Sequence, residues 1–331
     1  MAYSMNCEAN WPCVALENAS LAERTTMRVG GSVRWLLEPT SPDELRGAYL
    51  AALESGLPIR FLGGGANIVA ADGTWNGVVI SSAQMRRIFR PLPGTSDTEG
   101  MDAGDADFRM AMPEPAYDPR LIAWAGCTLP ALVRTTKGLG YSGLEGLMGV
   151  PGHVGGGIAM NAGGSWGDIW DHIEFVRLLN PEGEFVDVPR AAAHPTYRNG
   201  NLNGGLVVGA VWKLEPAPKL VVEARIREYL LHKQKVQPVT QWSAGCVFKN
   251  PDPERSEGRS AGKLVDDVGL KGFAIGDAQV SPLHGNFIVN LGKASASQVF
   301  ELMDQVQDRV AQATGVELEF EVKRWLAQSQ Q

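Results

Sequence analysis

Two glycine-rich loops are the parts of this sequence whose residue types and spacing best suit chemistry. The first, residues 63–67 (Gly-Gly-Gly-Ala-Asn), directly follows an apolar segment, and the second covers residues 149–164. Because glycine has no side chain, several backbone N–H groups of such a loop can converge on a phosphate without a basic residue. Two such loops beside one groove would suit a long diphosphate ligand. For the first loop alone, a plain tight turn is an equally good interpretation.

Neither loop follows the usual dinucleotide-binding fingerprint. Gly63 and Gly65 match its first two glycines, but Ile68 stands where the third belongs, and no helix is predicted to follow. This argues against an ordinary Rossmann NAD domain. In the second loop, so many glycines would destabilise a buried segment unless the backbone must approach something closely. His153 lies within it, where it could contact phosphate or flavin, or be an ordinary packed loop histidine.

The elements that must position these loops alternate between strands and helices. Ser41, Pro42 and Glu44 predict a helix start with an N-cap, a first-turn proline and a capping box, and Gly56 predicts its end. Further helices are predicted at 129–137, 221–235, 261–268 and from Ser295 or Ser297 to Gly315. Strands are predicted at 33–37, 59–62, 78–80, 121–124, 175–179, 184–188, 206–214, 273–275 and 287–289. Residues 316–322 alternate in a way typical of a half-buried strand with a wet glutamate edge.

Length, charge and cysteine content narrow the function classes. With 331 residues, 44% of them hydrophobic, the chain can form two or three domains without disulfides. A formal net charge of −7 argues against nucleic-acid or anionic-membrane partners. The four cysteines show no zinc-site spacing and are too few for a disulfide framework, so we predict no metal and a reducing compartment. Without a signal peptide or a membrane-spanning apolar run, we expect a cytoplasmic protein, acting as a monomer.

Three segments have the composition of connections. Residues 1–20 show little periodicity and are expected to form an irregular lead-in. Residues 91–119 are rich in proline, glycine and acids, which favours a mobile surface insertion over a functional lid. Residues 215–218 (Glu-Pro-Ala-Pro) are the best candidate for a linker between domains.

Several separated motifs, read in order, resemble those of the UDP-N-acetylenolpyruvoylglucosamine reductase (MurB) family. They cover roughly residues 20–326 and are Thr26-Met-Arg-Val-Gly-Gly31, Leu62-Gly-Gly-Gly-Ala-Asn67, Gly143-Leu-Glu-Gly146, Gly149-Val-Pro-Gly152, Met160-Asn-Ala-Gly163, Tyr197-Arg198, Ser243-Ala-Gly-Cys-Val-Phe-Lys-Asn-Pro251, Ala261-Gly-Lys-Leu264, Gly269-Leu-Lys-Gly272 and Glu319-Phe-Glu-Val322. The short segment between Arg198 and Cys246 resembles the subclass with the shorter C-terminal half.

The resemblance implies an α+β fold: two FAD-binding lobes of the vanillyl-alcohol-oxidase type, at 21–85 and 86–216, and a smaller UDP-sugar-binding lobe at 219–326. It also implies that NADPH reduces FAD, and that hydride then passes to the enolpyruvyl β-carbon of UDP-N-acetylglucosamine enolpyruvate. The product would be UDP-N-acetylmuramate, for peptidoglycan synthesis. The implied cofactor contacts are Arg28, Gly63, Gly64, Gly65, Ala66, Asn67, Gly152, His153, Gly156, Gly157, Asn161 and Ala162.

Three catalytic residues follow from the resemblance. Hydride addition builds negative charge on the enolate of the substrate carboxylate, which Arg198 would stabilise with its charged fork. Glu321 could donate a hydrogen bond to the enolate if its pKa is raised enough to keep it protonated. Cys246 stands where the family commonly has serine, and as a mostly protonated thiol it would give the final proton to the α-carbon. A small buried cysteine without a role is the alternative.

The remaining implications are less direct. Gly200 replaces a serine usual in the family, so a hydrogen bond is expected to be missing there. The candidate substrate contacts are Tyr197, Lys235, Lys249, Asn250 and His284. Two other functions stay open: an FAD-dependent oxidase or dehydrogenase acting on another substrate, and a non-catalytic nucleotide-sugar- or flavin-binding protein. The motifs around Cys246 and Glu321 argue against the first, and the presence of all three catalytic candidates argues against the second.

Overall fold

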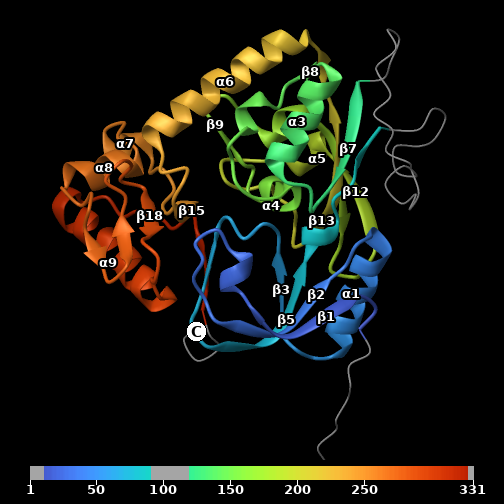
Figure 1. Cartoon of the computed structure of the whole chain (residues 1–331), viewed down its shortest axis with the longest axis horizontal. Helices are drawn as coiled ribbons and strands as arrows, with labels where there is room; N and C mark the ends of the chain where they lie inside the picture. Colours follow the sequence, from blue (N-terminus) through green and yellow to red (C-terminus); the bar gives the residue numbers. More distant parts are fainter. Residues whose placement is uncertain (1–10, 91–118, 327–331) are drawn as a thin grey trace, which may run out of the picture.

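The computed structural model describes residues 11–90 and 119–326, which form three sheets of four or five strands, three two-stranded sheets and the helices packed on them (Figure 1). Nearly all of the predicted insertion 91–119, and residues 1–10 of the predicted lead-in, lie outside the described residues. The helices are α1 (Pro42–Glu54), α3 (Leu129–Leu139), α4 (Val154–Ala159), α5 (Arg190–Ala193), α6 (Lys219–Val236), α7 (Pro253–Ser256), α8 (Ala261–Asp267) and α9 (Ala296–Thr314). None of these helices is both long enough and apolar enough to cross a lipid bilayer.

The first sheet is mixed and carries the first glycine loop. Its strands, in the order β1-β2-β5-β3, are β1 (Val14–Ser20), β2 (Ser32–Glu38), β5 (Thr74–Ser81) and β3 (Ile59–Leu62). Helix α1 begins at Ser41, whose hydroxyl accepts the Glu44 N–H at 3.2 Å, and the Glu44 carboxylate accepts from Thr40, one residue before the predicted capping-box position. Because β3 runs directly into residues 63–67, the loop lies at the carboxyl end of a half-buried parallel edge strand.

The second sheet is antiparallel throughout and carries the second glycine loop. Its order is β12-β11-β13-β7-β6. The strands are β6 (Ile88–Phe89), β7 (Arg120–Trp124), β11 (Ile173–Leu179), β12 (Phe185–Pro189) and β13 (Leu206–Lys213). The glycine loop forms the short helix α4, which packs on β13, and then the hairpin of β9 (Gly163–Gly164) and β10 (Gly167–Asp168).

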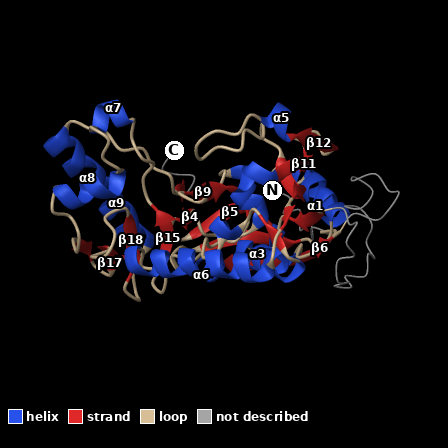
Figure 2. Cartoon of the chain, turned by 90° about the horizontal axis from the view of Figure 1, so that it is seen from above, coloured by secondary structure: helices blue, strands red, loops and turns tan. Residues whose placement is uncertain are grey.

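The third sheet is antiparallel and is joined to the others by α6, which crosses from the second sheet to the third (Figures 1 and 2). Its strands, in the order β15-β18-β17-β16, are β15 (Trp242–Cys246), β18 (Phe287–Asn290), β17 (Ala278–Val280) and β16 (Ala274–Ile275). Beyond α9, β19 (Lys323–Trp325) returns to pair in parallel with β4 (Ile68–Ala70), directly after the first glycine loop. The last described strand therefore lies against the segment that follows the first glycine loop.

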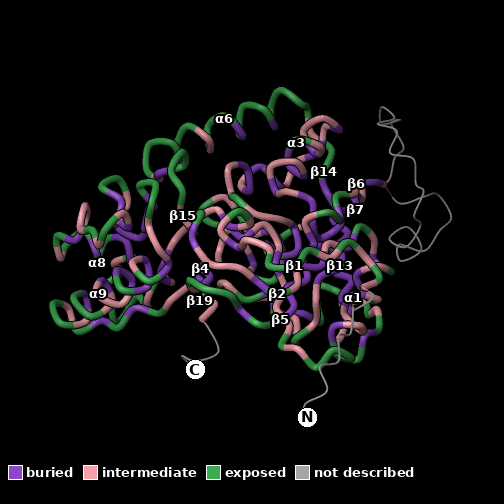
Figure 3. The backbone as a smooth tube through the Cα atoms, turned by 60° about the horizontal axis from the view of Figure 1, so that its bottom comes forward, coloured by how far each residue is buried: buried purple, intermediate pink, exposed green. Residues whose placement is uncertain are grey.

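The buried residues cross the boundaries between sheets (Figure 3). One cluster joins Leu37 and Ile80 of the first sheet to Trp124 and Val211 of the second. Another joins residues beside the first glycine loop, such as Val69, to the core of α9 and the third sheet. Since apolar burial is the main stabilising contribution to folding, these shared cores fix the glycine loops relative to one another.

Most predicted elements are present, but two expectations, the irregular lead-in over residues 14–20 and the strand at 316–322, are wrong. Residues 14–20 of the predicted lead-in form an edge strand, β1, held by backbone pairing with β2 rather than by apolar alternation. The predicted linker at 215–218 includes the short strand β14 (Glu215–Pro216), which pairs with β8 (Tyr141–Ser142), and leads directly into α6. Residues 316–322 keep their alternating burial, but form only an isolated bridge at Phe320 and no strand. The α+β class itself is confirmed by the separate, mainly antiparallel sheets and their helices.

Candidate active site

The two glycine loops lie face to face. A Cβ atom placed on Gly64 would be 2.8 Å from the Cα of Gly152 and 2.9 Å from the ring of His153. A Cβ on Gly63 would lie 3.7 Å from the backbone nitrogen of Gly156. The backbones therefore approach as closely as glycine permits, which is the close approach that the glycine content predicts.

The first loop is locked from its other side as well. Gly65 has a left-handed φ of +62°, and a Cβ there would be 2.1 Å from the carbonyl oxygen of Arg24. The N–H of Thr26 donates to the Gly65 carbonyl at 3.1 Å. Arg28 lies in the same segment, with a left-handed φ of +58° and its guanidinium on the Glu23 carbonyl at 3.2 Å.

Two buried polar atoms beside these loops have no hydrogen-bond partner among the described residues. They are Nδ1 of His153 and Oδ1 of Asn161. Burial, and then the charge of Arg86, lowers the pKa of His153, so the imidazole is neutral near pH 7 and can donate or accept. A glycine-walled surface with unpaired polar atoms fits a ligand that carries both a phosphate and a ring with polar edges, as FAD does.

Arg198 projects from a tight turn held against the second glycine loop. Thr196 and Asn199 exchange two backbone hydrogen bonds, and the side chain of Asn161 donates to the Thr196 carbonyl at 3.0 Å. Arg198 itself adopts a left-handed φ of +56°. Next to it, a Cβ on Gly200 would lie 2.2 Å from the carbonyl oxygen of Ile158, so this turn has no room for a serine side chain there.

Cys246 and Glu321 come from neighbouring extended segments. The N–H of Glu321 donates to the Val247 carbonyl at 2.8 Å, so Glu321 lies beside the residue that follows Cys246. Gly245 has a φ of +79°, and the pairing of β15 with β18 shifts register between Ser243 and Cys246. Such an irregularity re-aims the side chain that follows it.

The Arg198 guanidinium joins this pair across the lobes. Its Nε donates to Oε1 of Glu321 at 2.8 Å, with the two side chains only 17% and 13% exposed. Burial raises the pKa of Glu321, against the opposing effects of Arg198 and Lys249. Burial and the Glu321 charge raise the pKa of the Cys246 thiol to about 12, and Arg198 opposes them. The site thus holds a fixed cation, an acid that retains its proton more readily than usual, and a fully protonated thiol.

Several contacts connect this cluster to the glycine loops. The side chain of Asn67 donates to the Glu321 carbonyl at 3.1 Å. Arg198 donates to the Gly163 carbonyl at 3.3 Å, and its guanidinium lies 4.7 Å from the Tyr197 ring centre. The acid and the arginine therefore lie directly beside both loops.

Other candidate substrate residues flank the cluster. The Tyr197 hydroxyl accepts the Asn250 N–H at 3.3 Å, and Asn250 accepts the Ala261 N–H at 3.1 Å, at the start of α8. Lys249 forms an exposed ion pair with Glu319 at 3.2 Å.

Two predicted substrate residues lie apart from these contacts. Lys235 is exposed in the last turn of α6 and makes no hydrogen bond or ion pair with a described residue. His284 packs edge-on against Phe287, and its Nδ1 accepts the Asn286 N–H at 3.1 Å. Burial, then the charge of Lys271, lowers the pKa of His284.

Two further residues, one beside Arg198 and one beside the turn that precedes the second glycine loop, were not predicted from the sequence. Asp168 caps the turn after β10, and burial and then the Asp171 charge raise its pKa, whereas Arg198 opposes this rise. Lys233 on α6 is buried against the Gly146–Met148 turn. No local sequence pattern indicates a functional role for either residue. Asp168 shows only a capping pattern, and Lys233 is one of several charged residues on a helix.

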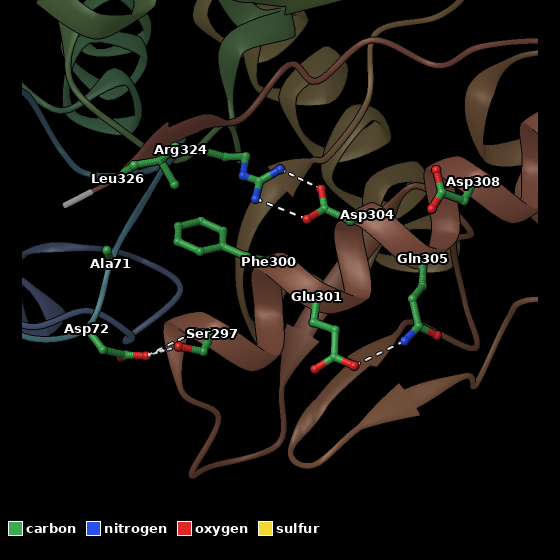
Figure 4. A pocket seen from close by; sticks show the side chains of 10 residues that line it. All are labelled: Ala71, Asp72, Ser297, Phe300, Glu301, Asp304, Gln305, Asp308, Arg324 and Leu326. Atoms are coloured by element: carbon green, nitrogen blue, oxygen red, sulfur yellow. Dashed lines mark hydrogen bonds and ion pairs between the residues drawn. The ribbon is translucent and has the colours of Figure 1, made fainter. Parts of the chain in front are cut away.

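A cavity of about 410 Å³ lies away from this cluster, between α9 and the segments around Asp72 and Arg324 (Figure 4). Its acids mostly have partners: Asp72 accepts from Ser297, and Asp304 pairs with Arg324. None of the predicted catalytic, cofactor or substrate residues lines it.

Comparisons with known proteins show which family the chain resembles. The family model "UDP-N-acetylenolpyruvoylglucosamine reductase, C-terminal domain" matches residues 237–325, and "FAD binding domain" matches residues 115–189. A UDP-N-acetylenolpyruvoylglucosamine reductase of Synechococcus sp. (strain WH7803) is 37% identical over 317 residues, covering 94% of this chain and 93% of the relative. The Deinococcus radiodurans protein of the same name is also 37% identical, with 94% and 96% covered.

The fold comparison gives the same result. The crystal structure of UDP-N-acetylenolpyruvylglucosamine reductase (MurB) from Thermus caldophilus superposes with a TM-score of 0.72 at 33% identity. The match covers 95% of this chain and 98% of that one. With identity of this level over nearly the whole length, the chain belongs to the UDP-N-acetylenolpyruvoylglucosamine reductase (MurB) family.

Proposed function

We propose that this chain is an FAD-dependent reductase that uses NADPH to convert UDP-N-acetylglucosamine enolpyruvate into UDP-N-acetylmuramate, for peptidoglycan synthesis in the cytoplasm. The observation that carries the proposal is the meeting of Arg198, Cys246 and Glu321 beside the two facing glycine loops. An enolpyruvyl reduction needs a group that stabilises the developing negative charge, a group that donates a proton and a surface that binds a flavin. Arg198 with Glu321, Cys246 and the facing glycine loops would supply these three functions.

The residues that would hold FAD are those of the facing loops. Backbone N–H groups of residues 63–67 and 152–157 would meet the diphosphate, while His153 and Asn161 offer their unpaired polar atoms to the ligand. When bound, FAD would supply the redox chemistry, which is the transfer of a hydride from NADPH to the β-carbon of the enolpyruvyl group. The chain's own task is to fix the alkene and to manage charge and protons around it.

Arg198 and Glu321 would stabilise the charge that develops on the substrate carboxylate. The guanidinium is already held in place by Glu321 and the Gly163 carbonyl, so little reorganisation is needed when charge appears. Glu321 has a raised pKa, which favours the protonated form that can donate to the enolate. An ionised Glu321 would instead repel that charge, so we assign catalysis to the protonated acid.

Cys246 would deliver the proton to the α-carbon. Its raised pKa, about 12, keeps the thiol loaded with a proton at neutral pH, but removes most of the acidity advantage that an ordinary thiol has over serine. The Glu321 charge is one cause of that rise, so protonation of Glu321 would make the thiol a better acid. After transfer, the thiolate would regain a proton from solvent.

The test is anaerobic turnover of wild type, Cys246→Ser and Cys246→Ala, followed by flavin absorbance and by product formation. NADPH should bleach the bound flavin in all three proteins. The enolpyruvyl sugar should restore colour rapidly in wild type and Cys246→Ser, while Cys246→Ala should form product about 10² times more slowly or worse, because it lacks the acid.

Cys13→Ala is the matched control, since Cys13 is half-buried near Glu38 and Glu44 at the first sheet, and it should behave as wild type. Full turnover by Cys246→Ala would remove the thiol from the mechanism. Purified protein that is colourless and cannot be reconstituted with FAD would overturn the whole assignment.

A further inference from the structure

Helix α6 contains a lysine whose environment is unusual for a helix that spans two lobes. In Figure 1 the helix runs along one side of the molecule, and in Figure 3 most of it is exposed. Its neighbours His232 and Gln234 are exposed, but Lys233 is only 7% exposed. Burying an ammonium group is unfavourable unless its donors are satisfied, so its contacts call for an explanation.

The Lys233 ammonium binds the backbone that precedes the second glycine loop. Nζ donates to the Met148 carbonyl at 2.6 Å and to the Gly146 carbonyl at 3.1 Å. It also lies 5.8 Å from the ring centre of Trp166. Burial lowers the pKa of Lys233 to about 8, as expected for a cation removed from water and paired only with dipoles.

The same turn is held at a second point. The Glu145 carboxylate accepts the Gly143 N–H at 2.6 Å and the Ser142 hydroxyl at 2.7 Å. Arg225, two turns before Lys233 on α6, reaches Ser142 at 3.0 Å and Glu145 at 3.4 Å. Helix α6 therefore binds the turn through one ion pair and one buried ammonium.

The turn leads directly to the flavin-facing backbone. Gly149 has a left-handed φ of +75°, and a Cβ there would lie 3.5 Å from the Lys233 side chain. Three residues later come Gly152 and His153, which lie against Gly64. Carbonyls of a loop held by a charged donor have far less freedom than carbonyls exposed to water.

We propose that Lys233 is a positioning residue: it fixes the 146–150 turn so that Gly152 and His153 face the first glycine loop in the geometry that binds FAD. The inference rests on the proposed FAD binding. The inference makes α6, which leads into the third sheet, a determinant of FAD affinity at the glycine loop of the second sheet.

The experiment compares FAD affinity of the full-length chain after removal and re-addition of FAD. Lys233→Met removes both donors and should weaken FAD binding at least about tenfold, or about 1.4 kcal/mol. It should also shift the visible circular dichroism of the bound flavin, because the ring contacts change. Lys233→Arg keeps a charged donor and should restore most of the affinity and the wild-type spectrum.

Arg227→Met is the matched control, because Arg227 lies on the exposed face of the same helix. It should bind FAD as wild type does. An Lys233→Met protein with affinity within about twofold of wild type, or an equal loss in Arg227→Met, overturns the inference. Wild type that fails to bind FAD would instead overturn the proposed function.

If Lys233→Met fails to fold, amide hydrogen exchange of the wild-type protein with and without FAD tests the inference instead. Bound FAD should slow exchange in the 147–150 turn and in the last turns of α6 together. Protection of the turn without protection of the helix would show that the two are not coupled, and would overturn the inference.

Discussion

The facing glycine loops and the Arg198–Cys246–Glu321 cluster lie beside one another but are built in opposite ways. The loops are made of backbone from two short sequence segments, and their close packing leaves no space for a Cβ at Gly64 or Gly65. The cluster is made of three side chains, each from a different segment of the fold. A substitution in the backbone surface should therefore exclude FAD sterically or destabilise the fold. A substitution in the side-chain cluster should lower the rate of reaction while the fold and FAD binding stay intact.

The largest effect is expected at the loop with least space. Gly65→Ala should destabilise the protein by about 3 kcal/mol or more and abolish FAD binding, since the new Cβ would collide with the Arg24 carbonyl. Gly73→Ala is the control: its φ of +87° is also left-handed, but a Cβ there would have no neighbour within 4 Å in the part of the chain that the structure describes. It should cost only about 1 kcal/mol. Thermal unfolding and FAD titration measure both, and equal costs would show that steric exclusion is not the cause.

The cluster should respond in the opposite manner. Arg198→Met should lower kcat by about 10² to 10³ because it removes the preorganised cation, while FAD affinity stays near that of wild type. Arg134→Met, an exposed arginine on α3, should leave both quantities unchanged. If Arg198→Met lost flavin as readily as it lost turnover, the division between binding loops and chemical cluster would be wrong.

A smaller effect can separate binding from folding within the loops. No atom of the described residues lies within 4 Å of a Cβ on Gly156, which is exposed in α4. Gly156→Ala should therefore stabilise the FAD-free protein by about 0.5–1 kcal/mol while weakening FAD binding, because the methyl group occupies ligand space. Gly138→Ala in α3, equally free of contacts, should show the stabilisation alone. Unchanged affinity in Gly156→Ala would place the flavin elsewhere.

The smallest effect concerns pH. The pKa of Glu321 is raised in the folded state, so its contribution to stability is full below its unfolded pKa of about 4.3 and is lost as pH rises through the folded pKa. As pH rises through that folded pKa, the free energy of unfolding of wild type should therefore fall relative to that of Glu321→Gln, as measured by urea unfolding. Glu317→Gln, an exposed neighbour, supplies the control. If wild type instead became more stable relative to Glu321→Gln as pH rises, the effect of Arg198 on the Glu321 pKa would outweigh that of burial.

The sequence predicted the backbone part of the site better than the side-chain part. Glycine content is a local property, so residues 63–67 and 149–164 could be singled out without knowledge of the fold. Arg198, Cys246 and Glu321 became candidates only through the family resemblance, because long-range hydrogen bonds such as Glu321 N–H to Val247 leave no local pattern. Lys233 was missed for the same reason, since its burial depends on a turn far away in sequence.

Among the elements, helices with clear caps were predicted well, and the failures have identifiable causes. Ser295 caps α9 and Gly315 ends it with a left-handed φ of +73°, as their types predict. Strand β1 was missed because an edge strand needs only backbone partners and carries little apolar signal. Apolar and polar residues alternate over 316–322 because one side of this segment packs on a hydrophobic core. Such alternation indicates which side chains are buried, but not whether the backbone pairs with another strand.

The parallel pairing of β19 with β4 has a consequence for biosynthesis. Ile68–Ala70 follow the first glycine loop closely, yet their hydrogen-bonding partners, Lys323–Trp325, are synthesised 255 residues later. A nascent chain on the ribosome must therefore carry an open strand edge beside the first glycine loop while the intervening residues are made. Open edges are where unfinished chains adhere to one another, so chaperone protection should matter most during that interval.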